Sequence, residues 1–348
     1  MEKIIDAVDV ALIKQELTPE TLLCESNKGG NLIYVVDAHN APNTMREIGR
    51  LREIAFRAAG SGSGQSCDID RFDTMELPYQ QMVVWDPDAD RIIGGYRFIL
   101  GRDVKLREDG QPDITMAHLF HFSDSFVRNY LPHAVELGRS FVVPEYQSSS
   151  AGAKAIFALD NLFDGLGAIM MKYQSLMYFF GKMTMPAAYD GSARDLIHYF
   201  VDKHFPDSEM LARPYKPVLP ATDTRLLEMI LDEEAMKDDF RKLKTAVRRL
   251  DTGIPPLINS YINLSPTMKS FGTATNDEFS EAYETGILIS WNEMSTDKRE
   301  RHMMKFLERT VEGLKRRFPG LTSDVPGRLA VRWEERRLRS NSKNKKRK

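Results

Sequence analysis

Two charged residues, Glu136 and Arg139, directly precede a short apolar segment. That segment, Ser140 to Val143, combines β-branched and aromatic residues and is followed by Pro144, which predicts a buried strand that ends there. A charge beside a core strand needs a partner, because an unpaired buried charge costs several kcal/mol. In a cleft, a carboxylate can take up a proton and an arginine can bind a second carboxylate through two hydrogen bonds. The pair therefore indicates either a structural ion-pair network or a reaction site.

Three other stretches contain residue types that hold ions or phosphates, and each lacks part of the required pattern. The glycine-rich segment Gly60–Gly64 follows an expected helix, whereas a phosphate loop joins a strand to the next helix. The acidic segment Cys67–Asp73 lacks the central glycine and the final glutamate of a calcium loop. His118 and His121 have neither the glutamate nor the third ligand of a zinc protease site. We therefore expect no metal ion.

The composition is that of a globular protein with one large domain or two modest ones. The chain has 348 residues, of which 42% are hydrophobic and 28% charged, and its net charge is −2. It has no run of about 18 apolar residues and no signal-peptide core near its first residue. The two cysteines, Cys24 and Cys67, are too few for a disulfide framework. These features predict a cytoplasmic protein without a membrane span.

The positive charge is concentrated at the C-terminal end. Residues 327–348 contain ten Lys or Arg and two Glu, a net charge of +8, which leaves about −10 for the rest of the chain. Such a polar, basic segment is typical of a disordered tail. It either keeps the chain soluble or attracts an anionic surface such as a membrane, a nucleic acid or an acidic protein.

Hydrophobic periodicity and turn residues predict the elements of the first half. A short amphipathic helix lies between Ile4 and Leu17, and Thr18–Pro19 has the pattern of a helix start. Two strands joined by the turn Asp86–Asp90 form a hairpin, in which the pair Gly94–Gly95 indicates a bulge or a close backbone approach. The remaining expected elements are a strand at 31–36, a helix at 45–59 and the hairpin strands at 80–85 and 91–100.

Helices and strands also alternate in the second half. The small-residue loop Gln147–Gly152 lies between the expected strand at 140–143 and a long helix, an arrangement that offers backbone N–H groups to an anion. Thr224–Leu250 is highly charged and predicts a solvent-facing helix or an insertion. Further expected elements are helices at 153–173, 193–205 and 295–318, a short helix from Pro255, and strands at 178–184 and 287–291. We therefore expect an α/β (α+β) fold with one mixed central sheet flanked by helices.

Several short motifs occur in an order that is known from one group of enzymes. The motifs are Arg52-x-x-x-Phe56, Asp70-x-x-Asp73, Gly95-Tyr-Arg97 and Glu136-x-x-Arg139, followed by the segments 180–184 and 256–261. The first four resemble the acyl-homoserine-lactone synthases. The whole set is more similar to the ornithine- and glycine-lipid N-acyltransferases, hemolysin-like members of the GNAT superfamily. The resemblance covers residues 46–292, and the segments 47–54 and 68–73 look most like the glycine N-acyltransferases of Bacteroidetes.

The resemblance implies a GNAT-like fold and an N-acyltransferase activity. A fatty acyl group, 3-hydroxylated in the glycine-lipid enzymes, would move from acyl carrier protein to the α-amine of an amino acid. Glycine is favoured and ornithine is possible; the product would be a lyso-aminolipid. The basic tail would then meet the inner membrane peripherally or meet the acidic carrier, and no specific nucleic acid is expected. The implied organisation is an N-terminal extension (1–45), an acyltransferase domain (46–292), a C-terminal helical segment (293–326) and the tail (327–348).

The resemblance also implies roles for individual residues. Glu136 is the candidate base for the amine, and with Arg139 it forms the candidate catalytic pair. The alternative is that these two and the other motif charges form only a structural network. The residues implied in substrate binding are Arg52, Asp70, Asp73 and Arg97, one arginine of the cluster holding the acceptor carboxylate, and the backbone N–H groups of Val142 and Val143 at the thioester carbonyl.

The donor loop departs from the superfamily pattern. The usual coenzyme A loop, Gln/Arg-x-x-Gly-x-Gly/Ala, is only vestigial in Gln147–Gly152. Phosphopantetheine on a carrier protein has one phosphate and no pyrophosphate, so the degenerate loop fits a carrier better than free coenzyme A. The resemblance implies no permanently bound cofactor, and it places this phosphate against Ser148, Ser149, Ser150 and Gly152.

Three alternatives stay open at this point. A coenzyme A-dependent N-acetyltransferase would have the same fold with a different donor. An acyl-homoserine-lactone-type synthase would need an adenosylmethionine site, which the motifs do not supply. A non-catalytic binding protein could keep the fold without the reaction.

Overall fold

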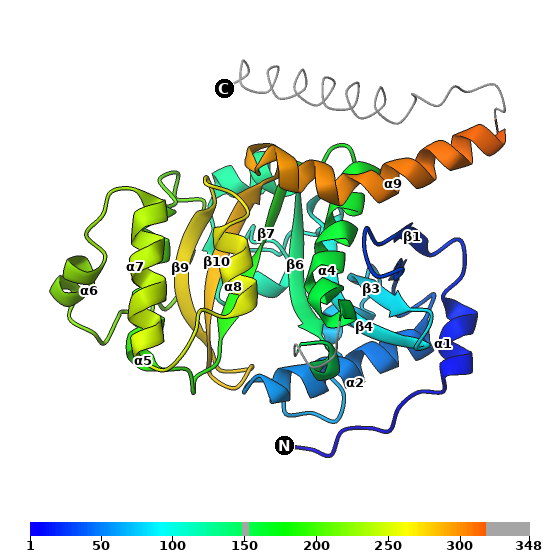
Figure 1. Cartoon of the computed structure of the whole chain (residues 1–348), viewed down its shortest axis with the longest axis horizontal. Helices are drawn as coiled ribbons and strands as arrows, with labels where there is room; N and C mark the ends of the chain where they lie inside the picture. Colours follow the sequence, from blue (N-terminus) through cyan, green and yellow to red (C-terminus); the bar gives the residue numbers. More distant parts are fainter. Residues whose placement is uncertain (148–152, 318–348) are drawn as a thin grey trace.

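The computed structural model of the chain describes residues 1–147 and 153–317, which are organised around one eight-stranded sheet (Figure 1). The strand order is β1-β2-β3-β4-β6-β7-β10-β9, and neighbours are antiparallel except for the parallel pair β6–β7. The strands of this sheet are β1 (Leu22–Glu25), β2 (Leu32–Val36), β3 (Gln80–Asp86), β4 (Arg91–Leu100), β6 (Ala134–Val142), β7 (Tyr178–Met185), β9 (Lys269–Asn276) and β10 (Ala282–Ser290). A separate two-stranded sheet pairs β5 (Phe120–Phe122) with β8 (Ala212–Pro214).

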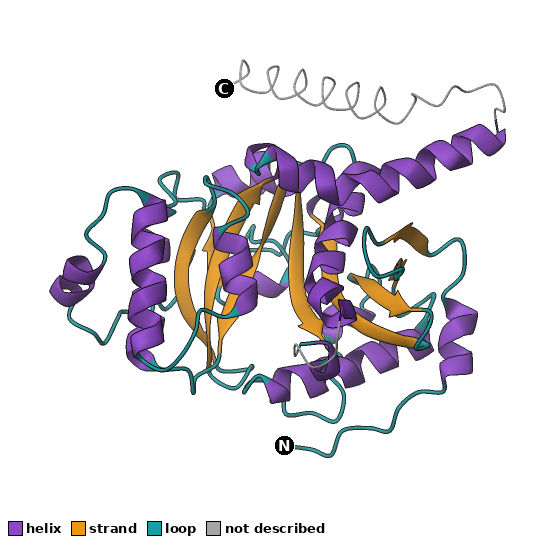
Figure 2. Cartoon of the chain, viewed as in Figure 1, coloured by secondary structure: helices purple, strands orange, loops and turns teal. Residues whose placement is uncertain are grey.

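Helices flank the sheet, which confirms the expected mixed sheet with helices around it (Figure 2). One face, which we name the α4 face, is covered by α4 and α8; the opposite α2 face is covered by α2, α3 and the segment 114–131. The helices are α1 (Val10–Glu16), α2 (Pro42–Ala58), α3 (Arg71–Thr74), α4 (Ala153–Lys172), α5 (Gly191–His204), α6 (Thr224–Ile230), α7 (Met236–Arg249), α8 (Pro256–Ile262) and α9 (Thr296–Arg317).

The first two strands come from the segment 1–45, which the sequence suggested as an extension, and β2 hydrogen-bonds along β3. The helix start expected at Thr18–Pro19 is wrong. The Thr18 carbonyl instead accepts hydrogen bonds from the N–H groups of Thr21 and Leu22, which closes a turn before β1. A four-residue edge strand leaves too short a pattern to be read from the sequence.

The hairpin of β3 and β4 is confirmed, and so is the close approach expected at its glycines. A Cβ atom on Gly94 would lie 2.7 Å from the Phe141 carbonyl oxygen, and one on Gly95 would lie 2.7 Å from the Met82 carbonyl oxygen. Either substitution would push the strands apart, because such contacts are shorter than van der Waals contact. The two glycines therefore hold β4 tightly between β3 and β6.

The strand expected at Ser140–Val143 begins earlier, at Ala134, so Glu136 and Arg139 lie inside β6 instead of before it. The parallel ladder of β6 with β7 runs only from Ala134–Tyr178 to Leu137–Gly181, although both strands continue beyond it. Figure 1 shows the two strands diverging from this point. The sheet is therefore split along the second half of β6.

The C-terminal part adds two strands that the sequence did not reveal. The strand β8 has only three residues, and the residues of β9 lack a clear alternation. The charged segment Thr224–Leu250 forms the helices α6 and α7, and a helix was one of the two structures expected there. Within the ranges that the structure describes, no helix is long and apolar enough to cross a membrane. Residues 318–348, with the basic tail, lie outside the described residues.

Candidate active site

A cavity of about 990 Å³ lies where β6 and β7 separate. Its walls come from the loops after α2, from β4, β6 and β7, from α8 and from the turn between β9 and β10. A cavity of this size can hold a long, thin ligand together with a small one. The split in the sheet is therefore the centre of the candidate site.

The cavity passes through the sheet and has a different character on each side. Successive side chains of a strand point to opposite faces. Phe179 and Ile289 therefore face α4 and α8, whereas Phe180 and Leu288 belong to a separate hydrophobic cluster on the α2 face. On the α4 face the lining is mostly apolar, with Leu137, Phe179, Leu257, Ile258, Tyr261 and Ile289. On the α2 face it is mostly polar, with Arg97, Arg139, Asp70, His118, Lys182 and Glu284.

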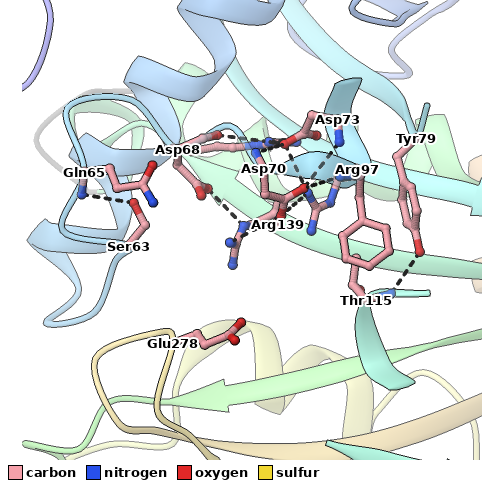
Figure 3. Close-up of polar contacts among 12 residues, drawn as sticks. Ser63, Gln65, Asp68, Asp70, Asp73, Tyr79, Arg97, Thr115, Arg139 and Glu278 are labelled. Carbon is pink, nitrogen blue, oxygen red and sulfur yellow. Dashed lines mark hydrogen bonds and ion pairs between the residues drawn. The ribbon is translucent and has the colours of Figure 1, made fainter. Parts of the chain in front are cut away.

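Asp73 is the centre of a buried cluster of charges on the α2 face (Figure 3). Nη1 of Arg52 lies 3.1 Å from Asp73, and Nη1 of Arg97 lies 3.1 Å from the same carboxylate. Arg97 also lies 2.7 Å from Asp70, which caps the short helix α3. Gln81 donates to Asp73 at 2.9 Å and accepts a hydrogen bond from Arg52. The predicted association of Arg52, Asp70, Asp73 and Arg97 is thus present, and it ties α2 and α3 to the sheet.

The charges of this cluster stabilise one another. Burial raises the pKa of Asp73, but the positive charges of Arg52 and Arg97 outweigh that effect and lower it to about 2. Burial lowers the pKa of Arg97, yet Asp73 and Asp70 raise it further than burial lowers it. Arg52 and Arg97 are almost fully buried, so both depend on these carboxylates for their charge balance.

Arg139 connects the cluster to the cavity. Two residues of β6, Arg139 and Ser140, oppose the single residue Tyr96 of β4, and the φ angle of Arg139 is +48°. This β-bulge turns the side chain out of the ladder. Its Nε lies 3.0 Å from Asp68, and its guanidinium carbon lies 4.6 Å from the centre of the Phe279 ring. Figure 3 shows it at the edge of open space, with Glu278 on the other side.

Glu136 does not belong to this cluster, although the sequence predicted Arg52, Asp70, Asp73 and Arg97 as its partners. Its carboxylate is fully buried and accepts hydrogen bonds from the Thr115 hydroxyl at 2.7 Å, the Met116 N–H at 2.9 Å and the Tyr79 hydroxyl. The correction has a simple cause: three residues span about 10 Å along a strand, so Glu136 reaches Tyr79 and the segment 115–116, whereas Arg139 reaches Asp68. The cavity wall includes Thr115 but not Glu136.

Comparisons with known proteins identify the family of this chain. Residues 51–155 match the acetyltransferase (GNAT) domain family. The chain is 52% identical over 315 residues to the glycine N(alpha)-acyltransferase of Bacteroides thetaiotaomicron, an alignment that covers 90% of this chain and 94% of that relative. It is 50% identical over 315 residues to the glycine N(alpha)-acyltransferase of Phocaeicola vulgatus, with 90% and 97% covered. The chain belongs to the glycine N(alpha)-acyltransferase family. It is therefore an acyltransferase with a GNAT fold, as the motifs indicated.

Two solved structures are also similar to this acyltransferase. They are a CoA-dependent acyl-homoserine lactone synthase, BjaI, with SAM and isopentyl-CoA, and the same protein with MTA. The identities are 11% and 10%, each alignment covers 80% of this chain and 90% of the other, and both TM-scores are 0.35.

Two backbone N–H groups of β6, those of Val142 and Val143, were predicted to bind the thioester carbonyl in this acyltransferase, and the prediction for Val143 is wrong. The Val143 N–H donates to the Ile93 carbonyl at 3.0 Å, so it is not available to a thioester. Alternate residues of an antiparallel strand point their N–H groups to opposite sides, which turns the Val142 N–H away from β4 and toward the split. The Gln147 side chain donates to the Val142 carbonyl on that side at 2.6 Å. The role predicted for the Val142 N–H therefore stays a prediction, and the one for the Val143 N–H is wrong.

Several residues of the acyltransferase site escaped the sequence analysis. The hydroxyls of Tyr96 and Tyr261 lie 2.9 Å apart on the α4 face, where burial raises the pKa of both. Lys182 and Glu284 form an ion pair of 2.5 Å on the α2 face. Asp68, Tyr96, Lys182 and Tyr261 lie inside the motif stretches 68–73, 95–97, 180–184 and 256–261, but the sequence provided no reason to assign them a role. Glu284 lies outside every motif.

Two further predictions concern ligands of the acyltransferase. Ser148, Ser149, Ser150 and Gly152 lie outside the described residues, while the long helix expected after them is confirmed as α4. No group of three or more His, Cys, Asp or Glu side chains that could hold a metal ion occurs in residues 1–147 and 153–317.

Proposed function

We propose that this acyltransferase moves a fatty acyl group from the phosphopantetheine arm of an acyl carrier protein to the α-amine of glycine. The observation that carries the proposal is the cavity that crosses the sheet, apolar on the α4 face and charged on the α2 face. An acyl chain fits the first half, because its transfer from water is favourable by about 0.8 kcal/mol per methylene. A zwitterionic amino acid fits the second half. The thioester then lies between them, at the split in the sheet.

The unpaired edge of β6 supports the position of the donor. A pantetheine arm contains amide groups, which can pair with a strand edge as another strand would. The Val142 N–H points to this edge, and Ser140 lines the cavity beside it. The phosphate at the far end of the arm would lie at the start of α4, near 148–152. A single phosphate, without a pyrophosphate, fits the vestigial loop at 147–152.

The charged half supports a small amino acid as acceptor. Arg139 is the cluster member whose guanidinium faces the open space, and an arginine binds a carboxylate through two hydrogen bonds. The relatives are named for glycine, which has no side chain to accommodate. Ornithine is the competing acceptor, and the relatives' names do not support it.

The reaction needs a neutral amine and a polarised carbonyl. The nitrogen attacks the thioester carbon, a C–N bond forms, the C–S bond breaks and the thiolate of the donor arm leaves. The ammonium loses two protons in all: one ends on the sulfur and one goes to solvent. The paired hydroxyls of Tyr96 and Tyr261, which burial keeps protonated, lie on the donor side and can supply the proton to sulfur.

A 3-hydroxyacyl chain would make the product a lyso-glycine lipid, an amphiphile that belongs in a membrane. The basic residues 327–348 would bring the enzyme to an anionic membrane surface or to the acidic carrier. Removing residues 338–348 should then weaken liposome binding or raise the KM for the carrier. If both stay unchanged, the tail has neither role.

The decisive experiment offers purified enzyme 3-hydroxyacyl carrier protein, acyl-coenzyme A and acetyl-coenzyme A, each with a panel of amino acids that includes glycine and ornithine. Product detection by mass spectrometry should show N-acylglycine from the carrier at the highest kcat/KM. Acetylation from acetyl-coenzyme A alone would overturn the donor, and a preference for ornithine would overturn the acceptor. Absence of any product would favour a non-catalytic binding protein.

A further inference from the structure

His118 is placed on the charged side of the cavity, at the end of the 3₁₀ helix formed by Thr115–His118. This helix belongs to the segment that covers the α2 face, so the ring lies on the side where the proposed acceptor binds. The residue is exposed, and its side chain forms part of the cavity wall. From the sequence, His118 was assessed only as a possible zinc ligand.

The hydrogen bond of the ring fixes which nitrogen carries the hydrogen. Nδ1 lies 2.5 Å from the Thr115 carbonyl oxygen, and a carbonyl oxygen can only accept. Nδ1 therefore holds the hydrogen, and Nε2 of the neutral ring holds a lone pair. Burial lowers the pKa of His118, and the charge of Lys182 lowers it further, so the ring is neutral at pH 7. Among the described residues, Nε2 has no hydrogen-bond partner.

The buried carboxylate of Glu136 holds the helix that carries this ring. It accepts hydrogen bonds from the side chain of Thr115 and from the N–H of Met116, while the Thr115 N–H donates to the Tyr79 hydroxyl at 3.1 Å. The hydroxyl, N–H and carbonyl groups of Thr115 are thus all engaged, the last of them by His118. This chain of contacts fixes the ring relative to β6.

We propose that Nε2 of His118 is the general base that removes a proton from the ammonium group of the acceptor, and that Glu136 is a positioning residue for it. The inference rests on the proposed acyl transfer to glycine. In this step the N–H bond of the ammonium breaks, its electron pair stays on nitrogen, and the proton forms an imidazolium. The imidazolium then passes the proton to solvent or to the departing thiolate.

The charges around the ring suit a group that becomes positive. Lys182 on β7 opposes an imidazolium, whereas Glu284 on β10 and Glu278 in the turn after β9 favour it. Glu284 neutralises Lys182 at 2.5 Å. The next charges on the same wall, Arg97 and Arg139, are themselves paired with Asp70 and Asp68. The acidic limb of the pH profile for glycine is therefore expected below pH 6.5, the ordinary histidine value.

The test compares two acceptors on wild type and His118→Gln. Glycine binds as an ammonium and needs a base, whereas the aminooxy nitrogen of aminooxyacetate is already neutral at pH 7 and keeps the carboxylate. We expect His118→Gln to lower kcat/KM for glycine by about 10²- to 10⁴-fold and for aminooxyacetate by less than about tenfold. The ratio of the two values does not depend on the fraction of folded protein.

Equal losses with both acceptors would overturn the inference, because they would indicate a structural role for His118. The absence of any loss would overturn it as well. His121→Gln is the matched control: His121 lies three residues along, on β5, where its ring packs against Tyr215. It should leave both values within about twofold of wild type. Wild-type enzyme that acylates no amine contradicts the proposed function itself. Wild-type enzyme that acylates aminooxyacetate but not glycine contradicts both the glycine acceptor and the base.

Discussion

The hydroxyl of Thr115 donates a hydrogen bond to the carboxylate of Glu136 at 2.7 Å, and this contact decides how the site motif is interpreted. The sequence predicted Glu136 as the base, since it precedes Arg139 in a motif that resembles those of acyl-transferring enzymes. In the folded chain its carboxylate is fully buried behind the cavity wall and accepts three hydrogen bonds. This position suits a residue that holds the segment 115–116 of the cavity wall in place and does not contact the amine.

Glu136→Gln should therefore act on stability as well as on rate. An amide can keep the bonds from Thr115 and Met116 through its oxygen, but its NH₂ cannot accept from Tyr79. The unsatisfied hydroxyl should lower the free energy of unfolding by about 1–3 kcal/mol, measured by urea denaturation. Activity should fall more with glycine than with aminooxyacetate, because only glycine needs the base that Glu136 positions. A fall confined to glycine, at unchanged stability, would restore Glu136 as the base.

Acid denaturation should reveal the charge cluster around Asp73. The pKa of Asp73 is about 2 in the folded chain, and the ordinary value is 3.8. The folded state therefore binds this proton more weakly than the unfolded state. The stabilisation is complete above pH 4 and disappears as the pH falls through 2. Its size is about 2 kcal/mol, at 1.36 kcal/mol per pH unit. Stability measured against pH should be flatter in this window for Asp73→Asn than for wild type.

Asp73→Asn should also be less stable at pH 7, by about 3–5 kcal/mol, because the buried Arg52 and Arg97 lose their shared partner. Asp124→Asn is the matched control, since its ion pair with Arg128 is exposed and such pairs contribute about 0–1 kcal/mol. Parallel curves for wild type and Asp73→Asn between pH 2 and 4 would contradict the lowered pKa.

Local pattern was enough to predict much of the fold. The helix α2, the hairpin of β3 and β4, and the strand and helix on either side of residues 147–152 all have strong periodicity or clear turn residues. Four strands were missed. Of these, β1 and β9 are edge strands whose sequences do not alternate, and β5 and β8 have only three residues each. The split between β6 and β7 had no local signal, because it depends on how far two distant strands pair.

The site was predictable only where its partners are close in sequence. Asp70 and Asp73 share one helical turn, and the association of Arg52 and Arg97 with them came from the resemblance. The partners of Glu136 were mispredicted because its donors, Tyr79 and Thr115, lie 57 and 21 residues away. The β-bulge that turns Arg139 toward Asp68 also had no local signal, because it depends on how β6 pairs with β4.

Arg139 should control the affinity for the acceptor carboxylate. Arg139→Lys keeps the charge but loses the planar fork, and hydrogen bonds to a charged group contribute about 1.5–3 kcal/mol. We expect kcat/KM for glycine to fall about 10- to 100-fold while the KM for the donor stays unchanged. Glycinamide, which lacks the carboxylate, should be affected far less. Arg107→Lys, an exposed arginine of the same cavity, is the control. Equal losses with glycine and glycinamide would assign the carboxylate to another residue.

The length of the acyl chain should depend on Ile289, on the α4 face. This buried residue of β10 lines both the large cavity and a small apolar pocket next to it, which is bounded by Trp291 and Phe163. Ile289→Phe narrows the passage and should shift the preference to shorter chains; Ile289→Val widens it and should favour longer ones. Since each methylene contributes about 0.8 kcal/mol, the relative kcat/KM should change about fourfold per methylene. Competition between carrier-bound chains of different lengths measures it, and identical profiles for both variants would place the end of the chain elsewhere.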